Sequence, residues 1–403
     1  MATQITDHVS WVGKTDWEIR TFHGNEYTTH HGTSYNAYLI RDEKTVLIDS
    51  VWNPYAEEFV EKLKKEIDLN EIDYIVMNHG EPDHSGALPY LMREIPDTPI
   101  YCTGNGVKSL RGQYHQDWNF VPVKSGDTLD LGSRQLVFVE ARMLHWPDSM
   151  FNYLTEDNIL FSNDAFGQHY CSEQLFNDLV DPCELEKEAI KYYANILTPF
   201  NKLVDKKITE LLDMNLPVDM ICPSHGVIWR DNPLQIVEAY REWANDYQED
   251  QVTIVYDTMY GNTRLLAEAL RDGMKEIDPG LRIKIFRISQ ADQNDVLTEV
   301  FRSKVLLAGS CTINNGILAE MAGFLEELEG LKYKNKKALS FGSSGWSGEA
   351  TQILDERLQK AGFELLDEGI KVLWTPDTDF LEKTREQGRA IARQLADESA
   401  TAQ

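Results

Sequence analysis

The sequence has few basic residues and few cysteines, and both shortages exclude classes of function. Among 403 residues there are 39 Lys and Arg against 66 Asp and Glu, which gives a formal net charge of −27. Such a chain repels a polyphosphate backbone and an anionic bilayer, so we expect neither nucleic acid nor membrane as a partner. The five cysteines include no C-x-x-C pair, which excludes a zinc ribbon or a rubredoxin-type iron site built on that motif.

A signal peptide and long apolar runs are also missing. The first eight residues lack a basic start and an apolar core, and no apolar run approaches the ~20 residues of a membrane span. An odd number of cysteines in a chain of this length is typical of a reducing compartment. We therefore expect a cytoplasmic protein.

Hydrophobic periodicity divides the chain into two α/β regions. The first mixes helices at 55–67 and 184–215 with short strands within 36–50 and at 73–77, 99–102, 119–123, 135–140, 158–162 and 218–222. The second alternates strands at 252–256, 281–286, 304–309, 337–341 and 370–373 with helices at 263–276, 292–302, 317–330, 348–362 and 378–397. Regular alternation indicates an open parallel sheet covered on both faces. We predict domains of residues 1–250 and 251–403, joined at the polar stretch 245–250.

A cluster of metal-binding side chains follows the predicted strand 73–77. His79, Glu81, Asp83 and His84 lie within six residues of one another. Because alternate positions share a side, the four can face two ions a few Å apart. A solvated polar loop is the alternative, but histidines and carboxylates at this spacing favour metal binding.

Three more candidate ligands, His145, Asp164 and His225, each follow an apolar run, as a ligand on the rim of a sheet would. Singly, each could instead be a core histidine or an aspartate that caps a loop. Together with the first four they predict a two-metal site. His23 and His169 could donate hydrogen bonds near the metals, but the sequence favours a packing role for both.

Three polar loops of the second region follow predicted strands and favour a phosphate-containing ligand. A small, hydroxyl-rich loop at a helix N-terminus presents backbone N–H groups to a phosphate, and the loops should converge at the carboxyl ends of the strands. The sequence has no Walker lysine and no G-x-G-x-x-G, which counts against a nucleoside triphosphate or a dinucleotide. The candidates are Thr258, Met259, Tyr260, Gly261, Asn262 and Thr263 in the first loop, Ser310, Thr312, Asn314, Asn315 and Gly316 in the second, and Ser343, Ser344, Gly345, Trp346, Ser347 and Gly348 in the third.

The two residue patterns together resemble those of one known family. The pattern H-x-E-x-D-H, followed by a distant His, Asp and His, resembles the flavodiiron proteins of the metallo-β-lactamase-like superfamily, and segments 146–150, 163–170, 192–200 and 229–233 resemble the core of bacterial flavorubredoxins. The second region resembles flavodoxins, although Tyr260 replaces a Thr of their T-x-T-G-x-T loop. The implied fold is a metallo-β-lactamase-like αββα sandwich followed by a flavodoxin-like α/β domain with a five-stranded parallel sheet.

The resemblance also implies cofactors and their ligands. FMN would place its phosphate in loop 258–263 and its isoalloxazine between the other two loops. Trp346, which lies between glycines that let the backbone approach a ring, could stack on the flavin or could instead be a core tryptophan under a turn. One iron would be bound by His79, Glu81 and His145, and the other by Asp83, His84 and His225, with Asp164 as the bridge. A carboxylate at Glu81, where the hydrolases of the superfamily generally have His, favours iron over zinc.

The implied activity is the reduction of nitric oxide to nitrous oxide, of dioxygen to water, or of both, and the closer likeness to flavorubredoxins favours nitric oxide. Electrons would pass from an external carrier through FMN to the irons. A head-to-tail homodimer, or a dimer of dimers, would bring the FMN of one subunit next to the irons of the other. Because the sequence lacks the cysteines of a rubredoxin module, we expect a separate rubredoxin or rubredoxin-like donor. The alternatives are a zinc hydrolase fused to a flavodoxin-like domain and a non-catalytic gas or redox sensor.

Overall fold

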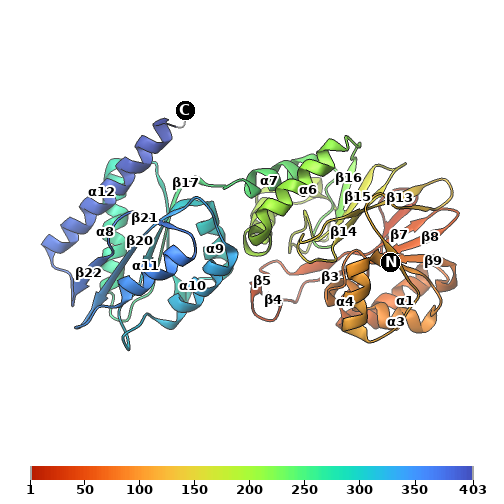
Figure 1. The fold of residues 1–403 in the computed structure, drawn as a ribbon, viewed down its shortest axis with the longest axis horizontal. Coiled ribbons are helices and arrows are strands. Elements are labelled where there is room, and N and C mark those ends of the chain that lie inside the picture. The colour runs from red at the N-terminus through yellow and green to blue at the C-terminus, as the bar shows by residue number, and fades with distance from the viewer. Residues whose placement is uncertain (1, 402–403) are drawn as a thin grey trace. The chain divides into compact units, whose positions relative to one another are not determined.

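The computed structural model describes residues 2–401 and divides into two compact units (Figure 1). The first unit runs to Tyr193 and resumes over Phe200–Asn245, and the second contains Ala194–Pro199 and the chain from Asp246 onward. The division at Asn245 lies within the polar stretch of residues 245–250. None of the helices in residues 2–401 combines the length and the apolar character that crossing a bilayer requires.

The first unit is a sandwich of two sheets with helices on its outer faces (Figure 1). One sheet has seven strands in the order β1-β2-β7-β8-β9-β10-β11, and the other has five in the order β12-β13-β14-β15-β16. Apolar side chains of both sheets meet in one core, among them Ile40 and Val76 of the first and Phe138 and Phe161 of the second. Burial of such side chains, each worth about 1.5–3 kcal/mol, holds the two sheets together.

The strands of this unit are short, and several of them end at the candidate site. They are β1 (Thr3–Gln4), β2 (Val9–Trp11), β3 (Lys14–Asp16), β4 (Thr21–Phe22), β5 (Tyr27–Thr28), β6 (Thr33–Tyr35), β7 (Tyr38–Arg41), β8 (Thr45–Ile48), β9 (Ile72–Val76), β10 (Ile100–Thr103), β11 (Phe120–Val123), β12 (Thr128–Asp130), β13 (Gln135–Glu140), β14 (Met150–Leu154), β15 (Ile159–Asn163) and β16 (Met220–Pro223).

The helices of the first unit are α1 (Ala56–Glu66), α2 (Pro82–Ser85), α3 (Leu88–Glu94), α4 (Gly104–Tyr114), α5 (Pro182–Tyr192), α6 (Asn201–Asp213) and α7 (Leu234–Ala244). The helical stretch predicted over 184–215 is therefore interrupted. A π-helical turn at Tyr193–Leu197 and a 3₁₀ turn at Thr198–Phe200 separate α5 from α6. Pro199 explains the break, because proline has no N–H to donate inside a helix.

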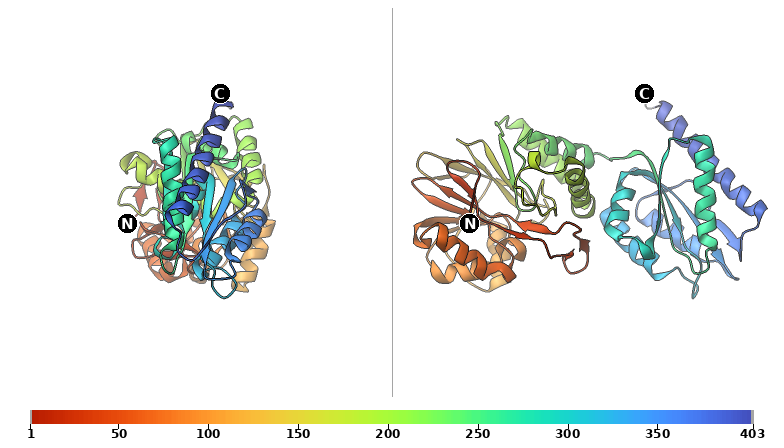
Figure 2. Two further views of the ribbon diagram at one scale, coloured as in Figure 1. Left: turned by 90° about the vertical axis from the view of Figure 1, so that its left-hand side faces the viewer. Right: turned by 180° about the vertical axis from the view of Figure 1, so that it is seen from behind.

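The second unit is a parallel sheet with helices on both faces, as the alternating pattern predicts (Figure 2). Its strands are β17 (Glu249–Tyr256), β18 (Arg282–Arg287), β19 (Ser303–Gly309), β20 (Lys337–Ser344), β21 (Glu364–Leu365) and β22 (Ile370–Leu373). Helices α8 (Asn262–Ile277) and α12 (Thr378–Thr401) pack together on one face, and α9 (Gln293–Arg302), α10 (Ala319–Leu331) and α11 (Ala350–Lys360) cover the other.

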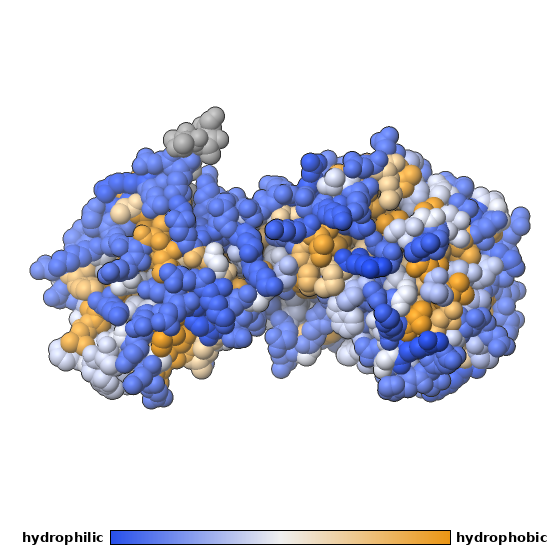
Figure 3. All heavy atoms as spheres, in the orientation of Figure 1, coloured by the Kyte–Doolittle hydropathy of each residue, from blue (hydrophilic) through white to orange (hydrophobic). Residues whose placement is uncertain are grey.

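The sheet order is β18-β17-β19-β20, and β21 and β22 both pair with β20 to fill the fifth position. The five-stranded parallel sheet is confirmed, with its last strand in two pieces. The two-residue β21 is too short to give a periodic pattern, which is why the sequence does not reveal it. The strand register places the carboxyl ends of β17, β19, β20 and β22 at one edge. Figure 3 shows mostly hydrophilic residues on the visible face of each unit, in keeping with the large net charge.

Candidate metal centre and cofactor cavity

All seven predicted metal ligands come together in the first unit, because the elements that carry them end at the same place. The loop after β9 carries His79 and Glu81, and the short helix α2 carries Asp83 and His84. His145 lies in the loop between β13 and β14, Asp164 directly follows β15, and His225 follows β16.

Asp164 occupies the centre of the cluster. Its Oδ2 lies 3.7 Å from Nε2 of His79 and 3.5 Å from Nε2 of His145. Its Oδ1 lies 3.0 Å from Nε2 of His84 and 3.6 Å from Nε2 of His225. Each carboxylate oxygen therefore faces a different pair of histidines, an arrangement that lets one side chain bridge two cations.

The outer carboxylates divide in the same way. Oε2 of Glu81 lies 3.1 Å from Nε2 of His79 and 3.5 Å from Nε2 of His145. Oδ2 of Asp83 lies 3.1 Å from Nε2 of His225 and 3.2 Å from Nε2 of His84. The geometry thus groups two imidazoles and one carboxylate on each side of Asp164, in the same two sets that the family resemblance implies.

Several of these atoms are buried without a hydrogen-bond partner among the described residues. They are both carboxylate oxygens of Asp83 and of Asp164, and Nε2 of His84. A buried carboxylate costs several kcal/mol unless a positive charge, from a metal ion or from protonated imidazoles, compensates it. His84 belongs to both groups of ligand atoms that lie within 4.8 Å of one another, the first with His79, Glu81 and Asp164 and the second with Asp83 and His225. These residues fit a pair of metal ions, and three carboxylates in the set suit a hard ion such as iron.

Charges within the cluster shift the pKa values of its members in opposite directions. Burial alone would lower the pKa of His84, but the carboxylates of Asp164 and Asp83 raise it to about 9. Burial would also lower the pKa of His145, but Asp164 and Glu81 outweigh this effect and raise the pKa to about 9. Conversely, burial would raise the pKa of Asp164, yet the neighbouring histidines hold it well below its usual range. Without metal, protons on His84 and His145 therefore balance negative charge on the carboxylates.

A cavity of about 460 Å³ opens beside the cluster. Glu81 and Asp83 lie on one side of it, and Phe22, Tyr35 and Trp52 contribute aromatic walls. His23 also lines this cavity, and its Nε2 lies 3.3 Å from Oε1 of Glu81. The sequence favours packing for His23, but this contact makes it a hydrogen-bonding residue at the cluster.

His169 packs behind the cluster. Its ring centroid lies 4.9 Å from that of His225, and its Nδ1 is 2.8 Å from Oγ1 of Thr33. Burial and the neighbouring His225 lower the pKa of His169 well below its usual range, so the ring is neutral. It therefore serves as a packed, hydrogen-bonded neighbour of a candidate ligand.

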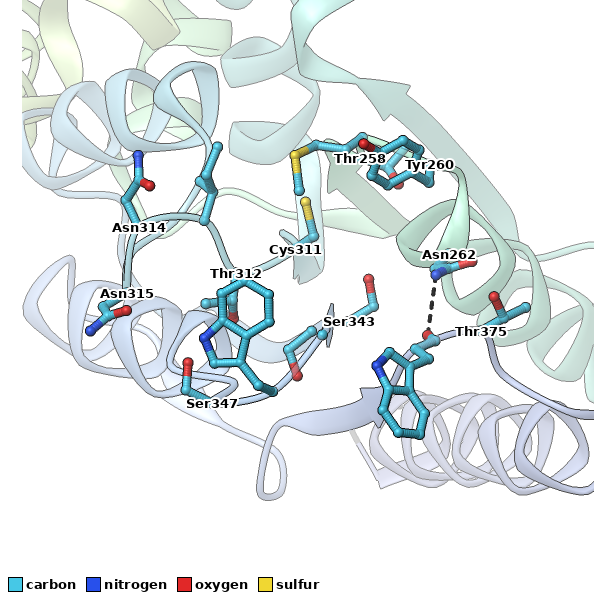
Figure 4. A pocket seen from close by; sticks show the side chains of 16 residues that line it. Thr258, Tyr260, Asn262, Cys311, Thr312, Asn314, Asn315, Ser343, Ser347 and Thr375 are labelled. Atoms are coloured by element: carbon cyan, nitrogen blue, oxygen red, sulfur yellow. Dashed lines mark hydrogen bonds between the residues drawn. The ribbon is translucent and has the colours of Figure 1, made fainter.

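The second unit contains a cavity of about 620 Å³ at the carboxyl edge of its sheet (Figure 4). The lining residues come from loops after β17, β19, β20 and β22, and Gly261 at φ 88° starts α8 at one end. Twelve of the predicted cofactor residues line it, namely Thr258, Met259, Tyr260, Asn262, Thr312, Asn314, Asn315, Ser343, Ser344, Gly345, Trp346 and Ser347. The volume and the helix N-terminus fit a ligand that carries both a ring system and a phosphate.

The other five predicted residues shape the loops. Thr263 and Ser310 are fully buried, and Ser310 accepts a hydrogen bond from the backbone N–H of Leu318 (3.1 Å). Gly316 pairs with Ile313 across a tight turn. Gly261 and Gly348 have φ values of 88° and 77°, which favour glycine.

Comparison with known proteins covers both units. Residues 33–226 match the model of the ODP family beta lactamase, and residues 254–388 match flavodoxin. The anaerobic nitric oxide reductase flavorubredoxin of Escherichia coli O6:K15:H31 is 58% identical over 398 residues, which are 98% of this chain and 83% of that protein. The Giardia intestinalis flavodiiron protein superposes with a TM-score of 0.93 at 33% identity, over 98% of this chain and 97% of that one. The chain belongs to the flavodiiron protein family.

Another solved relative of this flavodiiron protein is the rubredoxin oxygen:oxidoreductase of Desulfovibrio gigas. It superposes with a TM-score of 0.96 at 37% identity, over 99% of this chain and all of that one. The expected combination of a metallo-β-lactamase-like unit and a flavodoxin-like unit is thereby confirmed.

Sequence reasoning missed part of the cofactor cavity in this flavodiiron protein. Trp374 and Thr375, which directly follow β22, line the cavity, and the carbonyl of Trp374 accepts a hydrogen bond from Nδ2 of Asn262 (3.2 Å). Ile313 also lines it. The rule that loops converge at the carboxyl edge applies to the last strand as well, so it could have identified Trp374.

Proposed function

We propose that this flavodiiron protein reduces nitric oxide to nitrous oxide, with electrons that pass from an external carrier through FMN to a diiron centre. Two molecules of nitric oxide, two electrons and two protons yield one nitrous oxide and one water. The observation that carries the proposal is the placement of Asp164, whose two oxygens face two separate sets of two histidines and one carboxylate. The 58% identity to a nitric oxide reductase flavorubredoxin favours nitric oxide as substrate.

Reduction of dioxygen to water is the second candidate activity. A rubredoxin oxygen:oxidoreductase shares this fold over the whole chain with a TM-score of 0.96. Both substrates are small, neutral and diatomic, so the same buried centre can admit either of them.

Family membership and the flavodoxin match support FMN and two non-haem irons as the cofactors. When bound, the irons supply one-electron chemistry at positions open to a small gas, and FMN supplies electrons one at a time. The protein supplies the negative charge that balances the two irons. Glu81, Asp83 and the bridging Asp164 place three carboxylates around it, and four histidines complete the ligand set.

Aromatic side chains line one part of the metal-centre cavity. Phe22 and Tyr35 are buried, and Trp52, which is 36% exposed, lines the same cavity. A neutral gas loses little on entering such a site, whereas an ion would lose its hydration. Nε2 of His23, which lines the same cavity, donates a hydrogen bond to Oε1 of Glu81 (3.3 Å) and so orients that carboxylate.

In the second unit, the N-terminus of α8 and loop 258–263 would hold the FMN phosphate, because backbone N–H groups and the helix dipole favour an anion there. Trp346 and Trp374 would lie against the isoalloxazine ring. Both indoles line the cavity while 85% and 66% exposed, so a bound aromatic ring would cover apolar surface that the chain leaves open.

A homodimer, either head-to-tail or as a dimer of dimers, is proposed as the assembly. Its support is the FMN cavity, where Tyr260 is 90% exposed on the same cavity that Trp346 and Trp374 line, which leaves an aromatic side chain for a second subunit to cover. We expect sedimentation to show a dimer or a tetramer, and Tyr260→Glu to weaken it. A monomer at micromolar concentration would contradict the proposal.

A separate rubredoxin or rubredoxin-like protein is proposed as the electron donor, in line with the rubredoxin named in the relatives. The proposed location is the cytoplasm, where the five free cysteines would stay reduced. Rapid oxidation of NADH by the purified chain with no added carrier would contradict the proposed donor.

The activity is tested with anaerobically reduced protein that has been analysed for iron, zinc and FMN. We expect about two irons and one FMN per chain, and repeated formation of nitrous oxide from nitric oxide with a reduced rubredoxin as donor. Stopped-flow reoxidation with dioxygen measures the second activity. Stoichiometric zinc from a preparation without metal bias would favour a hydrolase, and a single reoxidation without turnover would favour a sensor.

A further inference from the structure

Asp148 contacts the candidate metal centre from outside the ligand set. It lies in the loop between β13 and β14, three residues after His145, and is 1% exposed. Its Oδ1 lies 2.9 Å from Nδ1 of His79, and its Oδ2 accepts the backbone N–H of Gly80 at 2.9 Å. Because both oxygens of this carboxylate accept, Nδ1 of His79 is the donor and carries the proton.

The surroundings of Asp148 leave its side chain little free space. A Cβ atom on Gly80 would lie only 3.0 Å from Oδ2 of Asp148 and 2.7 Å from Cβ of Ser109. Oγ1 of Thr103, at the end of β10, donates to the backbone carbonyl of Asp148 at 3.1 Å. The carboxylate is therefore fixed between β10 and the loop that carries His79.

On the other side of Asp164 the corresponding contact is neutral. Nδ1 of His225 lies 2.7 Å from the backbone carbonyl of Ser34. Both partners leave Nε2 free to face a metal, but a carboxylate withdraws the imidazole proton more strongly than a carbonyl does and makes the ring a better electron donor. The two sides of the centre thus have the same types of ligand, but Nδ1 of His79 contacts a carboxylate whereas Nδ1 of His225 contacts a backbone carbonyl.

We propose that Asp148 is a positioning residue that makes the two metal positions unequal: it fixes the His79 tautomer with a bare Nε2 and strengthens this imidazole as a ligand. The position formed by His79, Glu81 and His145 then binds a divalent ion more tightly, and it retains the more oxidised ion when the centre is half reduced. The inference rests on the proposed function only in that both positions take metal ions.

The test is a titration of the metal-free full chain with Co²⁺, followed by its visible absorption against a competing chelator. We expect two Co²⁺ per chain with unequal affinities. In Asp148→Asn the tighter affinity falls about ten- to a hundredfold and the weaker one is unchanged. Asparagine keeps the shape but cannot satisfy both contacts. If its NH₂ group faces His79, it donates to Nδ1 and forces the imidazole proton onto Nε2, the nitrogen that should face the metal. If its NH₂ group faces Gly80 instead, it meets the backbone N–H of Gly80, which is also a donor.

Thr103→Val is the matched control. It removes the hydrogen bond to the Asp148 carbonyl and loosens the same corner, but it leaves the carboxylate in place, so both Co²⁺ affinities should stay as in the unmodified chain. The proposal is overturned if Asp148→Asn lowers both Co²⁺ affinities equally, lowers only the weaker one, or lowers neither. It is also overturned if Thr103→Val lowers the tighter affinity as much as Asp148→Asn does.

Two further measurements complete the test. In the iron-loaded protein, Asp148→Asn should raise the lower of the two iron potentials and leave the other unchanged. If Asp148→Asn does not fold, ¹H NMR of the zinc-loaded unmodified chain decides, because the Nδ1 proton of His79 should resonate further downfield than that of His225; its absence or the reverse order overturns the proposal. The Co²⁺ and zinc arms need no turnover, so a chain inactive with both gases would refute the proposed function and leave this inference standing.

Discussion

The metal centre and the FMN cavity are built in opposite ways. At the metal centre the side chains are buried, as His79, Asp164 and His225 show with 1% exposure each, and they are held by contacts behind them. At the cavity the contributing groups are loops at a sheet edge, with Tyr260 90% and Trp346 85% exposed. One site is fixed by the packing of its own unit, whereas the other leaves aromatic surface for a ligand or another protein to cover. Changes at the first should therefore have large and local consequences, and changes at the second should be tolerated.

The largest effect is expected for Asp164→Asn. The amide keeps the shape but removes the charge that faces all four histidines, so at least one of the two metals should be lost. Turnover with nitric oxide should fall by more than the roughly 100-fold typical of losing an outer partner of a ligand. Iron and FMN analysis measures both sites at once, and FMN should stay at one per chain. Retention of two irons with half the turnover would contradict a bridging role.

One glycine at each site has a left-handed backbone, so an alanine substitution at each of them compares how tightly the two sites are packed. Gly226, beside His225, has φ 77°, and a Cβ there would lie 1.6 Å from Oε1 of Gln168, which itself accepts the N–H of Val227. Gly261 in the cofactor loop has φ 88° and no atom within 4 Å of a Cβ. We expect Gly226→Ala to cost about 2–5 kcal/mol of unfolding free energy and to lower metal content, and Gly261→Ala to cost only the backbone strain of about 1–2 kcal/mol. Urea denaturation measures both, and equal costs would mean that the two sites are packed alike.

The pH dependence of the metal-free chain should also separate the two units. The pKa values of His84 and His145 are raised from 6.5 to about 9, so their contribution to stability is complete below pH 6.5 and is lost as the pH rises through 9. Each unit of pKa shift corresponds to about 1.4 kcal/mol, enough to move Tm by several degrees. Calorimetry should show a lower Tm for the first unit at pH 9.5 than at pH 6.5.

The iron-loaded chain should behave in the opposite sense over this range, because metal binding requires the deprotonated histidines. A metal-free chain whose first unit gains stability between pH 6.5 and 9.5 would contradict the charge balance described here. The carboxylates affect stability at low pH instead. The pKa of Asp164 is lowered from 3.8, so its contribution is present at neutral pH and is lost only in acid.

The same contrast explains what the sequence could predict. The seven candidate ligands are metal-binding residue types that follow predicted strand ends, so the residues alone could single them out, and the family resemblance supplied their division into two sets. Asp148 could not be assigned, because an aspartate three residues after His145 acquires its role only when β13 and β14 bring its loop against Gly80. In the second unit the rule of converging strand ends identified three loops. Trp374 was missed although the strand before it, 370–373, was predicted, because the rule was not extended to this last strand, which pairs with β20 and ends at the same edge.

The smallest effect is expected for Trp346→Ala. An offset stack of one aromatic ring on another contributes about 0.5–1.5 kcal/mol, so the affinity of the FMN-free chain for FMN, measured by quenching of flavin fluorescence, should fall about two- to tenfold. Since Trp346 is 85% exposed, the Tm of the FMN-free second unit should not change. Trp17→Ala, which removes a 49% exposed tryptophan of the first unit, is the matched control and should leave FMN binding as it is. A large loss of stability in Trp346→Ala would show that this side chain supports the loop instead of the flavin, and the cofactor cavity would then resemble the metal centre more closely than its exposure indicates.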